Sequence, residues 1–178
     1  MSLVMDTAIR LGPPHRDDAA ALLKIHGAAV HRTAAPFYPP EIIQNWSRLS
    51  ISPQRVAWVQ EHWIEDPALT VIVARTGDRP VGFGFIHQAN ELQALYVHPD
   101  FGRRGIGSRL IAALIQAARQ QGMPYLTAHA SLNAAAFYQQ NGFDVLGPGT
   151  FRLNSGYTMD CVKIRKTLAD PNESSSVA

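Results

Sequence analysis

The sequence predicts an α/β (α+β) fold in one domain, with a mixed central sheet that is mostly antiparallel and flanked by helices. Three strand patterns separated by short turns, over 69–74, 81–86 and 92–98, predict an antiparallel meander. The third is followed by a glycine turn, an amphipathic helix and another strand pattern, over 125–130. Because a β-α-β connection joins parallel strands, we expect this last strand to run parallel to the third.

Length and composition favour one globular domain, which we assign to residues 1–168. With 46% hydrophobic and 17% charged residues, the 178-residue chain can bury a core. The Ser-rich tail, 169–178, is expected to be disordered. A net charge of +2 from scattered basic residues argues against nucleic-acid binding. Cys161 is the only cysteine and the histidines show no ligand spacing, so no metal is expected.

No membrane association is expected either. The longest apolar runs fall short of the ~20 residues that a membrane span needs. The first residues are broken by Asp6 too early for a signal peptide. We therefore expect a cytoplasmic protein.

The first elements are a short strand over 8–11 and a helix that begins at Asp17 and Asp18, where acidic residues suit a helix N-terminus. The apolar stripe of this helix includes His26. A histidine on such a stripe is expected to be a hydrogen-bonded core residue rather than a catalyst.

An aromatic segment, 37–63, follows and contains all three tryptophans. Pro40 and Pro53 suit the starts of two short helices, since proline is favoured in the first helical turn. Trp46 is expected to pack in the core. The remaining aromatic side chains exceed what two short helices need for packing, so we assign a substrate pocket to Phe37, Tyr38 and Trp58.

After the strand over 125–130, the sequence predicts a short helix over 133–140 that ends at Asn141-Gly142. A strand over 143–146 and a loop over 147–149 are expected next. A final strand, over 157–164, completes the domain.

The turn over 103–108 carries the clearest chemical signal. Gly105 and Gly107 have no side chain that would keep a ligand from the backbone, and the first N–H groups of the following helix have no partner within it. Together with the helix dipole and the charges of Arg103 and Arg104, these groups can form an anion site. From the residues alone, an ordinary turn with solvated arginines is the alternative.

Two phosphate motifs are excluded, because no lysine follows the glycines as in a P-loop and Leu110 stands where a dinucleotide fingerprint has its third glycine. What remains is L-x-V-x-P-x-x-x-x-R-G-x-G, from Leu95 to Gly107. This order resembles the coenzyme A signature, (Q/R)-x-x-G-x-(G/A), of the GCN5-related N-acetyltransferases, the GNAT superfamily. Gly102 replaces the usual Gln or Arg, which removes one contact to the pyrophosphate, and Arg103 is expected to substitute.

A second motif adds to this resemblance. The segment from Ala130 to Phe143 is similar to the GNAT pattern A-S-x-x-A-x-x-F-Y-x-x-x-G-F, and it follows the first motif after one helix and one strand. On these residues the chain is identified as a small, single-domain GNAT member of bacterial type. The resemblance implies a sheet of about seven strands whose parallel pair splays apart. It also implies acetyl-CoA as the cosubstrate.

The resemblance further implies how coenzyme A is held. The pantetheine arm is expected to fill the gap between the splayed strands like an added strand, along the backbone of Leu95, Tyr96 and Val97. Either Ser131 or Asn133 is expected to hydrogen-bond this arm. The pyrophosphate is expected on the turn that is formed by Arg103, Arg104, Gly105, Ile106, Gly107 and Ser108.

The implied reaction is acetyl transfer from a thioester to an amine. In the family, a tyrosine of the second motif protonates the departing thiolate, and Tyr138 matches it; the alternative is that Tyr138 only packs against the coenzyme. The amine must lose a proton, directly or through water, and Glu91 and His129 are the candidate bases.

The expected partner is a small-molecule amine or a protein amine, and a homodimer is left open. The aromatic segment has few carboxylates, which favours a monoamine with an apolar or aromatic body over a polycation. The alternative function is a non-catalytic sensor module that binds acyl-CoA. Gly102 and the undecided base keep that alternative open.

Overall fold

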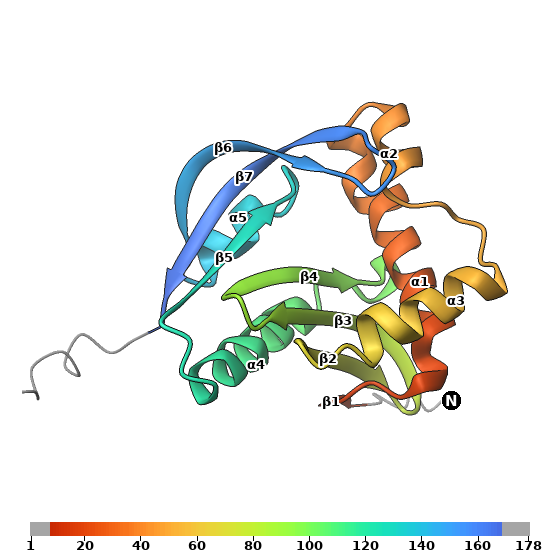
Figure 1. Cartoon of the computed structure of the whole chain (residues 1–178), viewed down its shortest axis with the longest axis horizontal. Helices are drawn as coiled ribbons and strands as arrows, with labels where there is room; N and C mark the ends of the chain where they lie inside the picture. The colour runs from red at the N-terminus through yellow and green to blue at the C-terminus, as the bar shows by residue number, and fades with distance from the viewer. Residues whose placement is uncertain (1–7, 169–178) are drawn as a thin grey trace, which may run out of the picture.

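The structure, a computed structural model, describes residues 8–168 and contains a seven-stranded mixed sheet (Figure 1). The strand order is β1-β2-β3-β4-β5-β7-β6, in which β4 and β5 are parallel and the other neighbours are antiparallel. This confirms the predicted fold class. The predicted disorder of 169–178 lies outside the described residues. The strands are β1 (Ile9–Gly12), β2 (Leu69–Thr76), β3 (Arg79–His87), β4 (Glu91–Val97), β5 (Tyr125–Ala130), β6 (Asp144–Arg152) and β7 (Thr158–Thr167).

The parallel pair is joined only at one end. Its register consists of the single pair Glu91↔Thr127, and the backbone N–H of Thr127 donates to Asn90 O at 2.9 Å. Beyond this point β4 and β5 diverge, as Figure 1 shows. The splayed pair that the family resemblance implied is therefore present.

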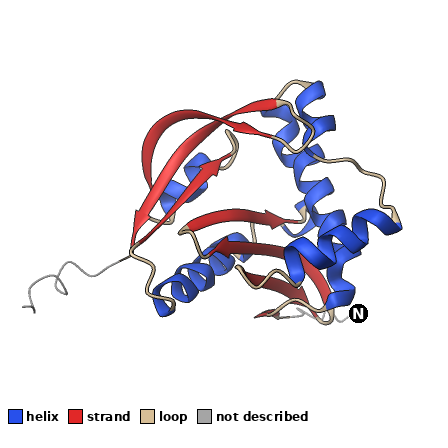
Figure 2. Ribbon diagram, in the orientation of Figure 1, coloured by secondary structure: helices blue, strands red, loops and turns tan. Residues whose placement is uncertain are grey.

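Helices cover both faces of the sheet (Figure 2). Helices α1 and α3 pack on one face of β2, β3 and β4 and α4 packs on the opposite face, while α5 packs against β6 and β7. Within residues 8–168, no helix has both the length and the apolar character needed to cross a membrane. The helices are η1 (Arg16–Asp18), α1 (Ala19–Ala28), η2 (Ala29–Ala34), η3 (Ala35–Phe37), α2 (Pro40–Trp46), α3 (Pro53–Val59), η4 (Gln60–Ile64), η5 (Pro99–Phe101), α4 (Ile106–Gln120) and α5 (Ala135–Gln140).

The predicted helix boundaries have visible local causes. Helices α2 and α3 both begin at the expected prolines, and the side chain of Ser52 caps α3 by accepting a hydrogen bond from Arg55 N at 3.3 Å. Helix α4 ends just before Gly122, whose φ of +71° suits glycine.

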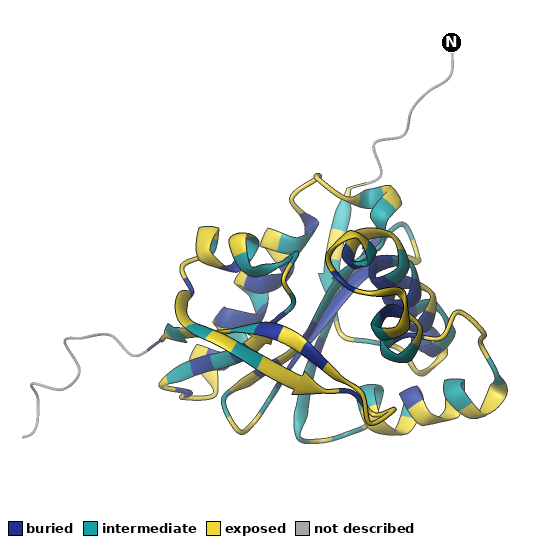
Figure 3. Cartoon of the chain, turned by 90° about the horizontal axis from the view of Figure 1, so that it is seen from above, coloured by how far each residue is buried: buried dark blue, intermediate teal, exposed yellow. Residues whose placement is uncertain are grey.

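The buried residues form a layer on each side of the sheet, and their positions follow the sheet and the inner helix faces (Figure 3). The long helix α4 lies very close to β3. A Cβ atom at Gly84 would come within 2.8 Å of the side chain of Leu114, so this contact requires a glycine in the strand. The close packing fixes the start of α4 relative to the end of β4, where the candidate site lies.

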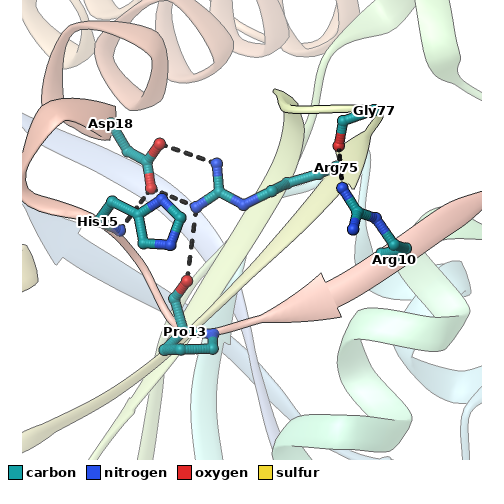
Figure 4. Close-up of polar contacts among 6 residues, drawn as sticks. All are labelled: Arg10, Pro13, His15, Asp18, Arg75 and Gly77. Atoms are coloured by element: carbon teal, nitrogen blue, oxygen red, sulfur yellow. Dashed lines mark hydrogen bonds and ion pairs between the residues drawn. The ribbon is translucent and has the colours of Figure 1, made fainter.

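A buried ion pair ties the start of α1 to β2 (Figure 4). Arg75 Nη1 donates to Asp18 Oδ1 at 2.9 Å, and the backbone N–H of His15 donates to the same carboxylate at 2.6 Å. Burial alone would raise the pKa of Asp18, but the hydrogen bonds from Arg75 and His15 outweigh it and hold the pKa below its usual value. Arg75 Nη2 also reaches Pro13 O, at 3.4 Å, so the turn before α1 is held as well.

One predicted boundary is wrong. The sequence suggested a strand over 143–146 followed by a loop over 147–149, whereas β6 runs without a break from Asp144 to Arg152. The strand has an irregularity between Val145 and Gly147, where Gly147 has φ +139°. Because β6 is an edge strand, Pro148 and the glycines beside it do not interrupt the sheet.

Candidate active site

Two cavities meet where β4 and β5 separate. The turn-side cavity, of about 500 Å³, extends from the end of β4 and the turn before α4 to η2 and α5. The hairpin-side cavity, of about 490 Å³, extends from the start of β4 to the β6–β7 hairpin and α1. The residues shared by both cavities mark their junction, and they are Trp46, Leu95, Tyr96, Ser131, Ala134 and Tyr138.

The turn before α4 has the geometry of an anion site. Its cap, Gly105, has φ +74°, and the first bond of the helix is the one from Arg109 N to Gly105 O, at 3.0 Å. The N–H groups of Ile106, Gly107 and Ser108 precede this bond and are left for a ligand. The helix is 15 residues long, so its dipole adds to the positive potential of these amides.

The charged and glycine residues of the turn have different positions. Arg103 lines the turn-side cavity, whereas Arg104 lies outside it with its guanidinium 5.4 Å from the ring centre of Phe101. A Cβ atom at Gly107 would lie 3.3 Å from the ring of Phe137, so this glycine also permits α5 to approach α4 closely. The sequence had suggested only ligand access as the reason for Gly107.

The backbone of β4 offers unpaired groups to the gap. The N–H of His98 donates to Val81 O at 2.8 Å, and the register continues regularly from Gly82↔Val97 to Phe85↔Ala94. Alternate residues of a strand direct their N–H and C=O groups to opposite edges. The groups of Leu95 and Val97 therefore point away from β3 and toward β5, which has already diverged.

The second motif contributes polar groups to the same junction. Asn133 lines the turn-side cavity, and its buried Oδ1 has no hydrogen-bond partner within residues 8–168. A buried oxygen of this kind needs a donor from outside the protein, which a ligand or an ordered water can supply. Ser131, the other candidate for this contact, lines both cavities.

Tyr138 lies at the junction with its side chain only 7% exposed. Its hydroxyl makes no hydrogen bond with another described residue, and its ring is held edge-on against Phe137 and Phe143. Burial, and to a smaller extent nearby Tyr96, raises the pKa of Tyr138 well above its ordinary value. The group is thus a neutral phenol with a free donor.

Both candidate bases line the hairpin-side cavity. The carboxylate of Glu91 accepts a hydrogen bond from Gln93 Nε2 at 3.0 Å, and the ring of His129 lies 5.7 Å from that of Phe151. Gln93 is the extra residue of a β-bulge in β4, since Phe85 pairs with Ala94 and Ile86 with Leu92. Sequence reasoning missed this bulge because no glycine or proline marks it.

The three residues assigned to a substrate pocket line neither cavity. Phe37 is 53% exposed, and Trp58 is 42% exposed and stacked on His62. Tyr38 is buried, and its hydroxyl donates to Asp160 O and accepts from Leu132 N, both at 2.8 Å. Tyr38 therefore connects its own segment to those of Leu132 and Asp160, and its ring packs edge-on against that of Trp46.

Other aromatic residues of the same region line the hairpin-side cavity instead. Trp46 and Trp63 are among them, joined by Phe85, Tyr96 and Phe151 from the sheet. Tyr96 accepts a hydrogen bond from the indole of Trp46, and burial raises the pKa of Tyr96 to about 12. The prediction that Trp46 belongs to the core was incomplete, because one side of this half-buried ring faces the cavities.

His26 also faces this cavity. As predicted, it is a buried, hydrogen-bonded residue, with Nδ1 lying 3.0 Å from Ser47 Oγ. The structure adds that its ring contributes to the cavity wall, which the helical pattern alone could not show.

Comparison with known proteins identifies the family. The model of the acetyltransferase (GNAT) domain matches residues 34–158, which include the turn, both cavities' central residues and the second motif. The chain belongs to the GNAT acetyltransferase family. This GNAT domain is similar to YafP, an uncharacterized N-acetyltransferase of Escherichia coli, with 29% identity over 130 residues, 72% of this chain and 77% of YafP.

Solved structures show the same fold. A GCN5-related N-acetyltransferase from Rhodopseudomonas palustris superimposes with a TM-score of 0.76 and 29% identity, covering 94% of this chain and all of that one. The yncA protein of Salmonella typhimurium, solved with its cofactor acetyl-CoA, has a TM-score of 0.68 and 22% identity, covering 96% of this chain and 99% of that one. The family that the two sequence motifs indicated is thus confirmed.

Proposed function

We propose that this GNAT domain transfers the acetyl group of acetyl-CoA to a primary amine, with both substrates bound at once. The observation that supports this most directly is the junction of the two cavities. One cavity reaches the anion site and the other reaches the candidate bases, and Tyr138, whose hydroxyl has no partner among the described residues, lines both. Two substrates can therefore enter from opposite sides and meet at one donor.

The coenzyme fits the turn-side cavity. The pyrophosphate would lie on the amides of Ile106, Gly107 and Ser108 with Arg103 beside it, which offsets the missing side chain at Gly102. The pantetheine arm would pair with the unpaired backbone of Leu95 and Val97. Its amide groups would supply the donor that the Oδ1 of Asn133 lacks.

The proposed chemistry is direct attack. The amine nitrogen forms a bond to the acetyl carbon, and negative charge develops on the carbonyl oxygen, near donors of β4. The C–S bond then breaks, the sulfur leaves with its electron pair, and Tyr138 supplies a proton to it. The proton that the amine loses passes to Glu91 or His129, directly or through water, since both line the acceptor side.

The acceptor would be a monoamine with an apolar or aromatic body. Aromatic rings form much of the hairpin-side cavity, and Glu91 is the only carboxylate among the described residues that line it. One carboxylate can attract one ammonium group, whereas a polyamine would leave further charges against aromatic walls.

The test is release of free thiol from acetyl-CoA with a panel of primary amines, each checked for the acetylated product by mass spectrometry. Amine-dependent release, with aromatic monoamines faster than spermidine, is the expected result. Binding of acetyl-CoA without transfer to any amine would instead favour the sensor module, which Gly102 keeps open.

A further inference from the structure

His26 is the only residue of α1 that lines the hairpin-side cavity. It is 9% exposed, and its ring meets those of Tyr96 and Trp63 edge-on, at 4.6 Å and 5.9 Å between centres. Because Nδ1 faces Ser47 Oγ at 3.0 Å, Nε2 is the nitrogen left for a ligand in the cavity.

Hydrogen-bond accounting fixes which nitrogen carries the hydrogen. Ser47 is 2% exposed, and within residues 8–168 its hydroxyl has no polar partner other than His26 Nδ1. If Nδ1 were the donor, the hydroxyl hydrogen of Ser47 would be buried without an acceptor, which is costly. Ser47 therefore donates to Nδ1, and His26 carries its hydrogen on Nε2.

A second histidine holds this arrangement in place. His31 Nε2 lies 2.6 Å from Ser47 O, and a carbonyl oxygen only accepts, so His31 donates to it. His31 thus holds the backbone of Ser47, the hydroxyl of Ser47 holds Nδ1 of His26, and the Nε2–H of His26 is left for a ligand in the cavity. Burial lowers the pKa of His26 to about 4, so the ring is neutral near pH 7.

The cavity lining beside this donor is also uncharged, and Arg55, whose charge acts with burial to lower the pKa of His26, is not part of that lining. The hydroxyl of Tyr96 accepts from Trp46 and keeps its own hydrogen to donate, and the indole of Trp63 can only donate. No lysine or arginine is present among the described residues that line this cavity. Such a wall suits a neutral oxygen, whereas a carboxylate would lose its water without gaining a counter-charge.

On the basis of the proposed acetyl transfer, we propose that His26 selects the amine by donating its Nε2–H to a carbonyl oxygen of the acceptor. The preferred acceptors are then small primary amines that carry a neutral amide carbonyl next to an apolar or aromatic body. His26 binds the acceptor in this scheme and takes no proton from it.

The test compares phenylalanine amide with phenethylamine as acceptors, and phenylalanine, whose carboxylate this cavity wall should disfavour, is the third acceptor. Phenylalanine amide and phenethylamine differ in amine pKa, so the ratio of their kcat/KM values is compared between variants rather than taken alone. In His26→Leu, which removes the donor, the preference for the amide over phenethylamine should fall about three- to tenfold, the size of one neutral hydrogen bond, and through KM. His26→Gln, which retains an N–H donor, should restore most of it. An unchanged ratio in His26→Leu would overturn the proposal.

A measurement without turnover separates this proposal from the proposed function. In ¹⁵N-labelled protein, the ring signals of His26 should show the Nε2–H form, and adding phenylalanine amide to the coenzyme A complex should shift the Nε2 signal. An Nδ1–H form would overturn the proposal whatever the activity. If the amide binds and shifts His26 but is not acetylated, the transferase function fails and this inference stands. Should His26→Leu not fold, Ser47→Ala replaces it, since losing the Ser47 donor should weaken the amide preference.

Discussion

At the scale of single residues, Tyr138 carries the proposed acid step. It combines burial, a raised pKa and a hydroxyl without a partner among the described residues. The raised pKa keeps the phenol protonated but also makes it a weaker acid than an ordinary tyrosine, so its proton has to pass to the sulfur as the C–S bond breaks.

We therefore predict that Tyr138→Phe lowers kcat by about ten- to a thousandfold, near the range for one general acid, while acetyl-CoA still raises the melting temperature. Steady-state kinetics and thermal shift on the same preparation measure both quantities. Phe143→Leu, a change at the ring that packs on Tyr138, is the control for altered packing. Equal losses in the two variants would assign Tyr138 a packing role.

His26 should also dominate the acid stability of the domain. Its pKa is about 4 when folded and about 6.5 when unfolded, so only the unfolded chain binds its proton between these values. Stability is then full above pH 6.5 and falls as the pH decreases toward 4, by about 3 kcal/mol in total. Asp18, with a pKa below 3.8, adds its own loss at lower pH.

The prediction is that His26→Gln loses less stability than wild type between pH 7 and pH 4.5, as measured by urea unfolding. His62→Gln, which changes an exposed imidazole, is the matched control and should follow the wild-type curve. A His26→Gln curve parallel to wild type would mean that the ring is not buried as the structure has it.

At the scale of elements, the turn before α4 combines charge with an unusual backbone. Arg103 has φ +60°, a conformation that glycine adopts without cost. Arg103→Gly should therefore leave the free energy of unfolding unchanged or slightly raised. It should weaken the binding of acetyl-CoA about tenfold, because one ionic hydrogen bond is lost. Calorimetric titration and urea unfolding measure the two effects.

The control for this prediction is Arg119→Ala, which removes the same charge from the exposed far end of α4. If Arg119→Ala weakens the binding of acetyl-CoA as much as Arg103→Gly does, the loss is caused by the change in net charge, and the turn is not the pyrophosphate site.

Elements were predictable from the sequence where local chemistry decides them. The strands of the meander, the helix that follows the glycine turn and the two proline-initiated helices all depend on neighbouring residues, and the structure has them close to the expected positions. The bulge at Gln93 and the continuous β6 depend on cross-strand register instead. No short window of sequence contains that information.

The same distinction separates the two sides of the candidate site. The residues suggested for the coenzyme lie within two contiguous motifs, and Leu95, Tyr96, Val97, Arg103, Gly107, Ser131 and Asn133 line one cavity. The acceptor side is assembled from α1, α2, η4, the sheet and the β6–β7 hairpin. Aromatic content alone therefore pointed to Phe37, Tyr38 and Trp58, whereas the folded structure brings Trp46, Trp63 and His26 together in one cavity.

At the scale of the whole molecule, the domain consists of two halves of a sheet that share one register pair, Glu91↔Thr127. One half carries α1, α3 and α4, and the other consists of β5, β7, β6 and α5 (Figure 1). A ligand that adds a strand between them would supply the hydrogen bonds that the halves do not make with each other. Binding and stability should accordingly be strongly linked.

The expected signature is an alternation in amide exchange along β4. In the free protein, the amides of Leu95 and Val97 face the gap and should exchange quickly, while that of Tyr96, paired with Phe83 of β3, should exchange slowly. Acetyl-CoA should slow the amide exchange of Leu95 and Val97 and leave that of Tyr96 nearly unchanged, because only the first two amides gain hydrogen-bond partners.

At a hundred times its Kd, acetyl-CoA should also stabilise the fold by about 2.7 kcal/mol. Amide exchange followed by NMR resolves all three positions. Equal protection of all three in the free protein would show that the gap is closed, and unaltered exchange of Leu95 and Val97 with coenzyme bound would place the pantetheine arm elsewhere.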